Sequence, residues 1–390
     1  MNIVVLKECG LDSVPPNATD VERRCGATPA TVEKYVSAGA SVLVEKGAGN
    51  LAGFSDESFS DAGASIVDDR VSLVSQADIL LYVAYPTDED VNHLKAGAIV
   101  IGHLDPFFQQ PLIEKLVEKE ATAISVEMIP RTTRSQKMDA LSSQSNLAGY
   151  VMVMNAASEL DSILPMMMTP AGTVNPAKVF IIGAGVAGLQ AIATAKRLGA
   201  QVTAFDTRPV VEEQVKSLGA KFLNIDLGDT GQTNQGYANA LSEEQQNKQK
   251  EGQRKAIADS DIVITTAKLF GRKPPLIVSD ADIQGMKPGS VIVDMAAEDG
   301  GNVEGSQAGK TALVHGVKVV GTGNWPNQVP KDATNLYANN LFNLIDDYWD
   351  KEAANFVLDL TDDILQGCVV CHEKQIINDM LIKHYNPEEA

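Results

Sequence analysis

The feature that most constrains the fold is a glycine-rich loop between a short apolar run and a helical segment. The loop reads Gly183-Ala184-Gly185-Val186-Ala187-Gly188, and the apolar run Lys178–Ile182 precedes it. In a strand–loop–helix unit, the first glycine allows a tight turn. The second leaves room for a phosphate beside the backbone, and the third lets the helix pack closely on the sheet. Because the helix amino terminus offers amide donors to a pyrophosphate, this pattern predicts a Rossmann-type dinucleotide-binding domain.

An acidic residue after the next apolar run indicates which dinucleotide is bound. Asp206 follows the run Gln201–Phe205, about 20 residues beyond the last glycine of the loop. A carboxylate at this place accepts hydrogen bonds from the adenosine ribose hydroxyls and repels a 2′-phosphate. Arg208 is compatible with NADP or with a solvated surface cation, but Asp206 favours NAD(H).

Short apolar strands alternate with amphipathic helices along almost the whole chain. This alternation predicts an α/β fold with two doubly wound, parallel-sheet, Rossmann-like domains and a cleft between them. The first run of expected strands covers 2–6, 41–45, 65–67, 79–84, 98–102 and 123–127. The second covers 178–182, 201–205, 221–225, 261–265, 290–294 and 317–320. Six strands are the number in a complete dinucleotide-binding domain.

Beyond Pro330 the chain turns helical again, with apolar residues at helical spacing. We expect this tail to pack on the first domain and make it discontinuous. The predicted domains are therefore 1–140 with 331–390, which is flavodoxin-like or Rossmann-like, and 141–330, which binds NAD(H). A second glycine pattern at 47–52 is interpreted as a turn, because the next helix begins only near Ser55.

Composition excludes several classes of function. The formal net charge is −19, which argues against nucleic-acid binding because that requires a positive surface. No apolar run reaches the roughly 20 residues of a membrane-spanning helix, and the amino terminus does not resemble a signal peptide. We therefore expect a cytoplasmic chain.

Four cysteines in 390 residues are not a disulfide framework. Cys368-Val-Val-Cys371-His372 matches the CxxCH pattern of haem attachment and also resembles a redox or metal pair. We expect structural thiols instead, on two short strands within 363–376.

The segment 131–150, RTTRSQKMDALSSQSNLAGY, resembles a specific family. It is similar to the NAD(H)-binding component, domain I, of proton-translocating NAD(P) transhydrogenase, and the resemblance covers nearly the whole chain. Further matching segments are 165–173, 183–199, 206–208, 213–219, 236–238, 265–267, 289–296, 300–302 and 324–326. The chain departs from the family in a longer segment before Arg24 and in residues 268–272.

The resemblance implies roles for individual residues. Around the nicotinamide end it implies the set Arg131, Gln136, Asp139 and Ser142. As adenosine and phosphate contacts it implies Val186, Asp206, Thr207 and Arg208, with Leu269 as a further nucleotide contact. Gly236 and Tyr237 match the tip of a loop that closes over the nucleotide. Taken without the family, the first set also fits a helix-capping loop with surface charges, and Tyr237 fits an aromatic residue packed locally.

The family is homologous to alanine dehydrogenase, so the two activities must be separated. Arg24 and His103 match an arginine and a histidine of alanine dehydrogenase, whereas its lysine position is Tyr82 and its aspartate position is Glu298. Reductive amination needs a carboxylate anchor and proton transfer. Hydride exchange between two nicotinamides needs only two rings held face to face. His103 also fits a hydrogen-bonded histidine at a strand end.

The favoured hypothesis is an NAD(H)-binding transhydrogenase subunit that exchanges a hydride with NADP(H) on a partner domain. The resemblance further implies a membrane-spanning partner that couples the exchange to proton translocation, a homodimer, and a peripheral position on the inner face of the membrane. The alternatives are an alanine-dehydrogenase-like enzyme of a small 2-oxo acid and a non-catalytic NAD(H)-sensing module.

Overall fold

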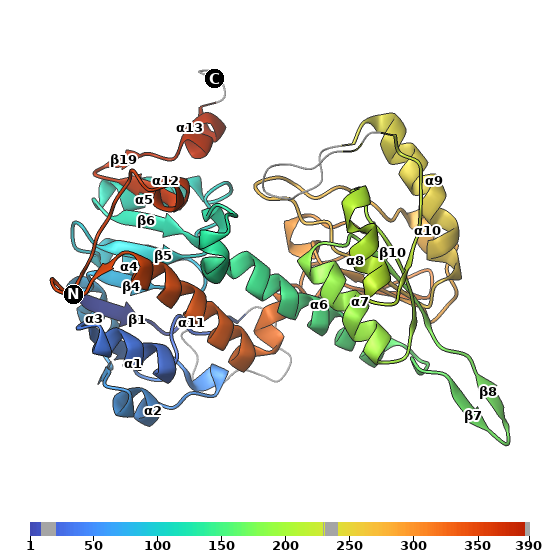
Figure 1. The fold of residues 1–390 in the computed structure, drawn as a ribbon, viewed down its shortest axis with the longest axis horizontal. Helices are drawn as coiled ribbons and strands as arrows, with labels where there is room; N and C mark the ends of the chain where they lie inside the picture. The colour runs from blue at the N-terminus through green and yellow to red at the C-terminus, as the bar shows by residue number, and fades with distance from the viewer. Residues whose placement is uncertain (9–20, 229, 231–240, 387–390) are drawn as a thin grey trace. The chain divides into compact units, whose positions relative to one another are not determined.

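The computed structural model describes residues 1–8, 21–228, 230 and 241–386. The chain divides into two compact units (Figure 1): unit 1 is Met1–Gln144 with Val329–Ala390, and unit 2 is Ser145–Gln328. The sequence predicts boundaries at 140 and 330. Helix α6 (Ala140–Glu159) runs across the first boundary.

Unit 1 is built on an eight-stranded sheet with the order β19-β18-β6-β5-β4-β1-β2-β3. Its parallel strands are β1 (Asn2–Val5), β2 (Ser41–Glu45), β3 (Ser65–Val67), β4 (Ile79–Leu81), β5 (Ile99–Gly102) and β6 (Thr122–Ser125). Every residue of β4 and β5 is buried, as expected for a parallel sheet covered on both faces. The strand order reverses between β1 and β4, which is the topological switch point of this sheet.

The helices of unit 1 connect these strands and cover them. They are α1 (Pro29–Ser37), α2 (Asp56–Asp61), α3 (Arg70–Gln76), α4 (Asp88–His93), α5 (Gln110–Glu118), α11 (Pro330–Asp347), α12 (Asp363–Cys368) and α13 (Asp379–Tyr385). Short 3-10 turns lie at η1 (Asn50–Ala52), η2 (Val126–Met128) and η3 (Arg134–Met138). Thr28 caps α1 in a capping box, so the sequence signal for that helix is confirmed.

The carboxyl-terminal segment completes unit 1. The Tyr337 hydroxyl on α11 donates to the Tyr82 carbonyl at 2.7 Å, and the Trp349 indole donates to the Ala38 carbonyl at 2.9 Å. Strand β18 (Val369–His372) pairs antiparallel with β6 and carries β19 (Gln375–Ile376) on its other side. A small hairpin, β16 (Trp349–Asp350) with β17 (Asn355–Phe356), follows α11.

The prediction of two strands over 363–376 is wrong for its first half. Asp363–Cys368 is helix α12, because the Asp362 side chain caps it by accepting from the Ile364 amide at 2.9 Å. Cys368 and Cys371 are free, buried thiols, and burial raises the pKa of each to about 12. Protonated, buried thiols agree with the structural role expected of this pair.

Unit 2 is built on a seven-stranded sheet with the order β11-β10-β9-β12-β13-β15-β14. Its parallel strands are β9 (Lys178–Ile182), β10 (Gln201–Phe205), β11 (Lys221–Phe222), β12 (Ile262–Thr265), β13 (Val291–Asp294) and β15 (Val317–Val320). Its helices are α7 (Val186–Arg197), α8 (Glu212–Ser217), α9 (Glu243–Asp259) and α10 (Asp280–Gln284). Its 3-10 turns are η4 (Pro209–Val211), η5 (Ala297–Asp299) and η6 (Trp325–Gln328). A continuous apolar core lies between the sheet and the helices, and includes Phe180, Val263 and Ile292.

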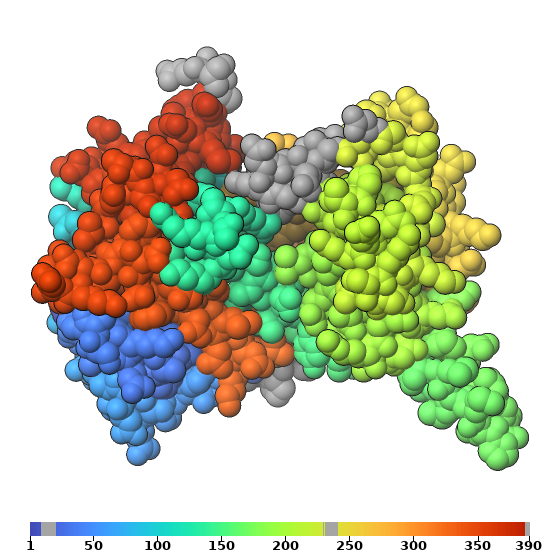
Figure 2. Space-filling model, viewed as in Figure 1, coloured from blue at the N-terminus to red at the C-terminus, as the bar shows by residue number. Residues whose placement is uncertain are grey.

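Six strands were predicted for this sheet and all six are present, but the antiparallel edge strand β14 (Thr311–Val314) was missed. It is joined to β15 by a two-residue turn in which His315 and Gly316 both have positive φ, 49° and 80°. A second hairpin, β7 (Met167–Thr169) with β8 (Gly172–Val174), was also missed. It projects from unit 2 as an exposed arm (Figures 1 and 2). The predicted class, α/β with parallel-sheet Rossmann-like domains, is confirmed.

Candidate functional site

The glycine loop of unit 2 has a conformation that depends on its glycines. Gly183 follows β9 with a φ of +101°, and a Cβ on it would lie 2.3 Å from the Thr266 hydroxyl oxygen. A Cβ on Gly188 would lie 1.9 Å from the Gly183 carbonyl oxygen. Both contacts are impossible for any residue with a side chain, so α7 meets the loop at the distance that only glycine permits.

The space beside Gly185 is open. The nearest atom to a Cβ built there is Arg208 Nη2, at 4.0 Å. Gly185 caps α7, and the helix continues from Val186 for 12 residues. An open backbone at the amino terminus of a helix of this length fits the pyrophosphate of a dinucleotide.

Thr266, which we did not single out from the sequence, holds this loop from the neighbouring strand. It follows β12, and its hydroxyl lies 3.2 Å from the Ile182 carbonyl oxygen and 3.1 Å from the Gly183 carbonyl oxygen. Strands β9 and β12 flank the switch point of the unit 2 sheet. The loop therefore lies where doubly wound sheets bind ligands. The signal for Thr266 was its place in the matching segment 265–267.

Asp206 lies at the carboxyl end of β10 with only 6% of its side chain exposed. Its carboxylate accepts from the Ala184 amide at 2.7 Å, which connects it to the glycine loop. It also accepts from the Arg208 amide at 2.8 Å and from Arg208 Nε and Nη2, each at 2.9 Å. The hydrogen bond to Asp206 raises the pKa of Arg208. Gly183, Gly185, Gly188, Asp206 and Arg208 thus form one group.

Two further predicted nucleotide contacts, Thr207 and Leu269, lie among the described residues. The Thr207 carbonyl accepts from the Thr230 hydroxyl at 2.5 Å. Leu269 follows β12 and forms an isolated bridge with Arg272. The Asn302 side chain, which sequence reasoning missed, donates to the Ala267 and Pro275 carbonyls at 3.0 and 2.9 Å and so holds the segment that carries Leu269. Gly236 and Tyr237 lie outside the described residues.

Three of the four residues predicted for the nicotinamide end are grouped in unit 1. The Asp139 carboxylate accepts from the Ser142 amide at 2.8 Å and from its hydroxyl at 2.6 Å. Arg131 Nε lies 3.6 Å from Asp139 Oδ2. Gln136 lies on η3 with an exposed side chain. Asp139 immediately precedes α6, which begins at Ala140.

The segment that carries these residues is fastened to the carboxyl-terminal part of unit 1. Arg134 Nη2 lies 2.5 Å from both carboxylate oxygens of Asp362 and 2.8 Å from the Tyr348 hydroxyl. The hydrogen bond from Arg134 lowers the pKa of Asp362 to about 2. Asn340 and Asn343 on α11 both donate to the Lys137 carbonyl at 3.0 Å. Local sequence gave no signal for these contacts.

The residues at the alanine dehydrogenase positions of unit 1 are engaged with other groups of the chain. Arg24 is 9% exposed, and its Nε and Nη2 donate to the two oxygens of Glu22, each at 2.8 Å. Its Nη1 donates to Gln144 Oε1 at 2.8 Å. Such a bidentate pair holds the guanidinium in one orientation.

His103 lies with its Nδ1 2.9 Å from the Val83 carbonyl and its ring stacked on Tyr337, with centroids 5.1 Å apart. Burial lowers the pKa of His103 and favours the neutral ring. This geometry agrees with a hydrogen-bonded histidine at a strand end. Nearby, the Glu8 carboxylate accepts from the Val83 and Ala84 amides at 2.5 and 3.2 Å, and burial raises its pKa to about 8.

The remaining two positions differ in burial. Tyr82 is 2% exposed. Glu298, in unit 2, is exposed and accepts from the Asn324 amide at 2.9 Å.

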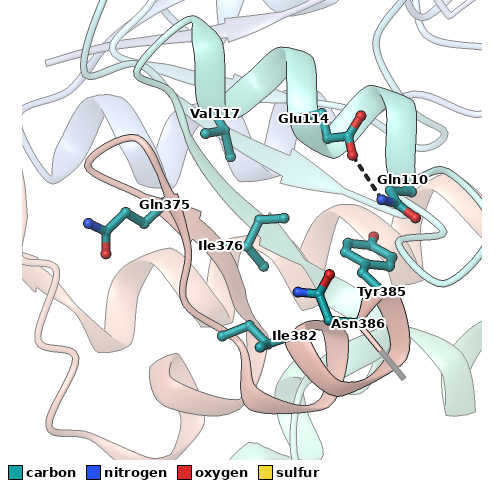
Figure 3. Close-up of a pocket in the computed structure, with 8 residues that line it drawn as sticks. All are labelled: Gln110, Glu114, Val117, Gln375, Ile376, Ile382, Tyr385 and Asn386. Carbon is teal, nitrogen blue, oxygen red and sulfur yellow. Dashed lines mark hydrogen bonds between the residues drawn. The ribbon is translucent and has the colours of Figure 1, made fainter. Parts of the chain in front are cut away.

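A surface pocket of about 500 Å³ lies elsewhere in unit 1, between α5, β19 and α13 (Figure 3). It is lined by Gln110, Glu114, Val117, Gln375, Ile376, Ile382, Tyr385 and Asn386. In the part of the chain that the structure describes, none of the residues predicted from the sequence for the nucleotide site is among them. The pocket belongs to unit 1, whereas the group around Gly183 and Asp206 belongs to unit 2.

Family comparison agrees with this architecture. The model described as "Alanine dehydrogenase/PNT, N-terminal domain" matches residues 13–148, and "Alanine dehydrogenase/PNT, C-terminal domain" matches residues 152–379. The chain belongs to the alanine dehydrogenase/PNT family. These matches confirm the resemblance seen in the sequence. The chain is an oxidoreductase of this family.

Sequence identity separates two groups of relatives within the alanine dehydrogenase/PNT family. The chain is 43% identical to the first part of the NAD(P) transhydrogenase subunit alpha of Rhodospirillum rubrum, over 95% of this chain and 98% of that protein. A crystal structure of transhydrogenase from Sinorhizobium meliloti matches with a TM-score of 0.84 and 40% identity, over 97% of this chain and all of that one. An L-alanine dehydrogenase matches with a TM-score of 0.81 but 26% identity, over the whole of both chains. The fold is shared by both groups, and the sequence is closer to the transhydrogenases.

Among the described residues, no helix combines the length and the apolar character needed to cross a membrane.

Proposed function

We propose that this chain is the NAD(H)-binding subunit of an NAD(P) transhydrogenase. It exchanges a hydride directly with NADP(H) held on a partner domain. A membrane-spanning partner couples the exchange to proton translocation. The chain would act as a homodimer and lie on the cytoplasmic face of the membrane through its partners.

The observation that carries the proposal is the group formed by the glycine loop and Asp206. The open backbone at Gly185 fits a pyrophosphate, and the Asp206 carboxylate fits the adenosine ribose hydroxyls of NAD(H). Bound NAD(H) supplies the nicotinamide carbon that gives or accepts the hydride. The role of this chain is then to bind the nucleotide, orient the ring and exclude water.

The residues of unit 1 support exchange between two nicotinamides rather than chemistry on a 2-oxo acid. Hydride exchange consumes and releases no proton, so it needs no general acid or base. Arg24 is already paired with Glu22 and Gln144, and His103 is hydrogen-bonded to the Val83 carbonyl. The Arg131–Asp139–Ser142 group and Gln136 would position the nicotinamide end without taking part in proton transfer.

The test is a transhydrogenation assay with the full chain and an NADP(H)-binding partner domain. The assay follows reduction of an NAD⁺ analogue with a shifted absorbance while NADPH is oxidised. The proposal expects turnover that requires both proteins. Nucleotide binding without transfer would favour the NAD(H)-sensing alternative.

The second candidate is an alanine-dehydrogenase-like enzyme, which the structural match to an L-alanine dehydrogenase keeps open. It predicts oxidation of NADH by the isolated chain when pyruvate and ammonium are supplied. Robust turnover in that assay would overturn the transhydrogenase proposal.

A further inference from the structure

We propose that Arg208 is a latent ligand for a 2′-phosphate, and that Asp206 keeps it unavailable by holding its guanidinium. The inference rests on the NAD(H) site proposed above and assigns the residue pair that sets its choice between NAD(H) and NADP(H). Asp206 would then reject the 2′-phosphate in two ways. Its own negative charge repels the phosphate, and its ion pair holds the Arg208 guanidinium that could otherwise bind it.

The first observation is that the Asp206 carboxylate is fully engaged by the chain itself. Oδ1 accepts from the Arg208 amide and Nε, and Oδ2 accepts from Arg208 Nη2 and the Ala184 amide, at distances of 2.7 to 2.9 Å. The two side chains are only 14% and 6% exposed. A forked pair of charge-assisted hydrogen bonds of this kind is stronger than neutral hydrogen bonds. A 2′-phosphate that binds Arg208 must therefore compete with Asp206 for the same guanidinium donors.

The second observation is where the guanidinium lies. Its Nη2 is the nearest atom to a Cβ built on Gly185, at 4.0 Å, so it stands beside the open part of the phosphate loop. The ribose of a bound dinucleotide would lie at the end of β10, next to Asp206, and its 2′ position would point into the same space. Arginine is well suited to this task because its planar donors match a phosphate in two hydrogen bonds.

Removing the charge of Asp206 should therefore change what Arg208 can bind. Asparagine has the same size and still offers an oxygen to the Ala184 amide, but it neither repels a phosphate nor holds a guanidinium strongly. A 2′-phosphate would then find a cation in place of a carboxylate. If Arg208 were merely a clamp on the loop, the same substitution would weaken every adenosine ligand alike.

The test uses the full chain and two small probes, 2′,5′-ADP and 5′-AMP, with binding measured by calorimetry. The variants are Asp206→Asn, Arg208→Leu and the double variant. We expect Asp206→Asn to bind 2′,5′-ADP about tenfold more tightly than the wild type or better, with no gain for 5′-AMP. The double variant should lose that gain, and Arg208→Leu alone should show none. A gain that survives in the double variant, or no gain in Asp206→Asn, would overturn the inference.

Two controls separate the possible failures. Wild-type binding of NADH reports the proposed site itself, so a wild type that binds no NADH overturns both the function and the inference. A wild type that binds NADH alongside an Asp206→Asn variant without the gain overturns the inference alone. Asp206→Ser, which also removes the carboxylate, gives the same comparison if the melting temperature shows that Asp206→Asn is unfolded.

Discussion

The two sheets of this chain have the same kind of switch point but treat it in opposite ways. In unit 2, the strand end at the switch point is followed by glycines, and the backbone at Gly185 is left open. In unit 1, the loops after β1, β4 and β5 bring together Glu8, Val83 and His103. Glu8 accepts from the Val83 amide, and His103 Nδ1 lies 2.9 Å from the Val83 carbonyl. One sheet makes room for a ligand by omitting side chains, whereas the other fills the equivalent place with them.

The comparison explains how similar topologies serve different tasks. A switch point becomes a nucleotide site only when the backbone after the strand is bare and a helix amino terminus faces it. In the proposed function, unit 1 instead acts through its segment 131–142, which is fastened by α11 and by the Arg134–Asp362 pair. Each side of this difference can be tested by substitution.

The largest effect should come from breaking the buried Arg24–Glu22 pair of unit 1. Glu22→Ala leaves the buried Arg24 guanidinium without its bidentate partner, and loss of one partner of a buried pair typically costs about 3–5 kcal/mol. Urea unfolding should show this loss of stability. The control is Lys46→Ala, which breaks the exposed pair with Asp68 and should cost less than about 1 kcal/mol. Equal losses in the two variants would show that the Arg24 cluster is not a buried network.

The glycine loop at the switch point of unit 2 should lose NADH affinity when a single methyl group is added. Gly188→Ala places a Cβ against the Gly183 carbonyl and pushes α7 away from the loop, so NADH affinity should fall about 100-fold, which equals about 2.7 kcal/mol. Gly285→Ala is the matched control, because its Cβ meets no atom nearer than 3.4 Å. Fluorescence titration with NADH measures both. Unchanged affinity in Gly188→Ala would contradict the site.

Substitution of Gln136 tests whether unit 1 positions the nicotinamide end of the nucleotide. Its exposed side chain on η3 has little structural role to lose, so Gln136→Ala should slow hydride transfer about tenfold and change NADH affinity less than threefold. A single-turnover measurement gives the rate and a titration gives the affinity. Asn146→Ala, at an exposed position on α6 outside the predicted set, should change neither. Equal losses of rate and affinity for Gln136→Ala would contradict a positioning role.

The smallest change between two measurements taken one pH unit apart should come from the Glu8 carboxyl group. Its pKa is raised from 4.5 to about 8 because it is buried, so the folded state holds a proton that the unfolded state releases. That contribution to stability is complete below pH 4.5, falls as pH rises, and is absent above about pH 8. The wild type should lose up to about 1.4 kcal/mol per pH unit relative to Glu8→Gln across this window. Unfolding midpoints of both proteins between about pH 5 and 9 provide the measurement, and parallel curves would refute the raised pKa.

Much of the fold was predictable because parallel strands are continuous apolar runs bounded by glycine and polar residues. The strands missed were those with other patterns. The β7–β8 hairpin is exposed on every residue and has no buried face to produce an alternation. Strand β14 alternates weakly, and its two-residue turn at His315-Gly316 lacks the usual Asn-Gly pair.

The candidate site was predictable where one local motif defines it. Gly183, Gly188 and Asp206 follow from a single strand–loop–helix–strand pattern. The contacts that hold the site come from distant parts of the chain and have no local signature. Thr266 lies 83 residues after Gly183, and Asp362 lies 228 residues after Arg134. The pairing of Arg208 with Asp206 depends on a side-chain conformation, so only the structure shows it.

The proposed function depends on this chain passing a hydride directly to or from a nucleotide on a partner. The sharpest measurement uses NADPH carrying deuterium at the transferred position, bound to the NADP(H)-binding partner domain, with the full chain and an NAD⁺ analogue. Direct exchange predicts that the reduced analogue contains the deuterium in one-to-one proportion, with none lost to water. Reduction without the label, or no reduction although both proteins bind their nucleotides, would contradict it.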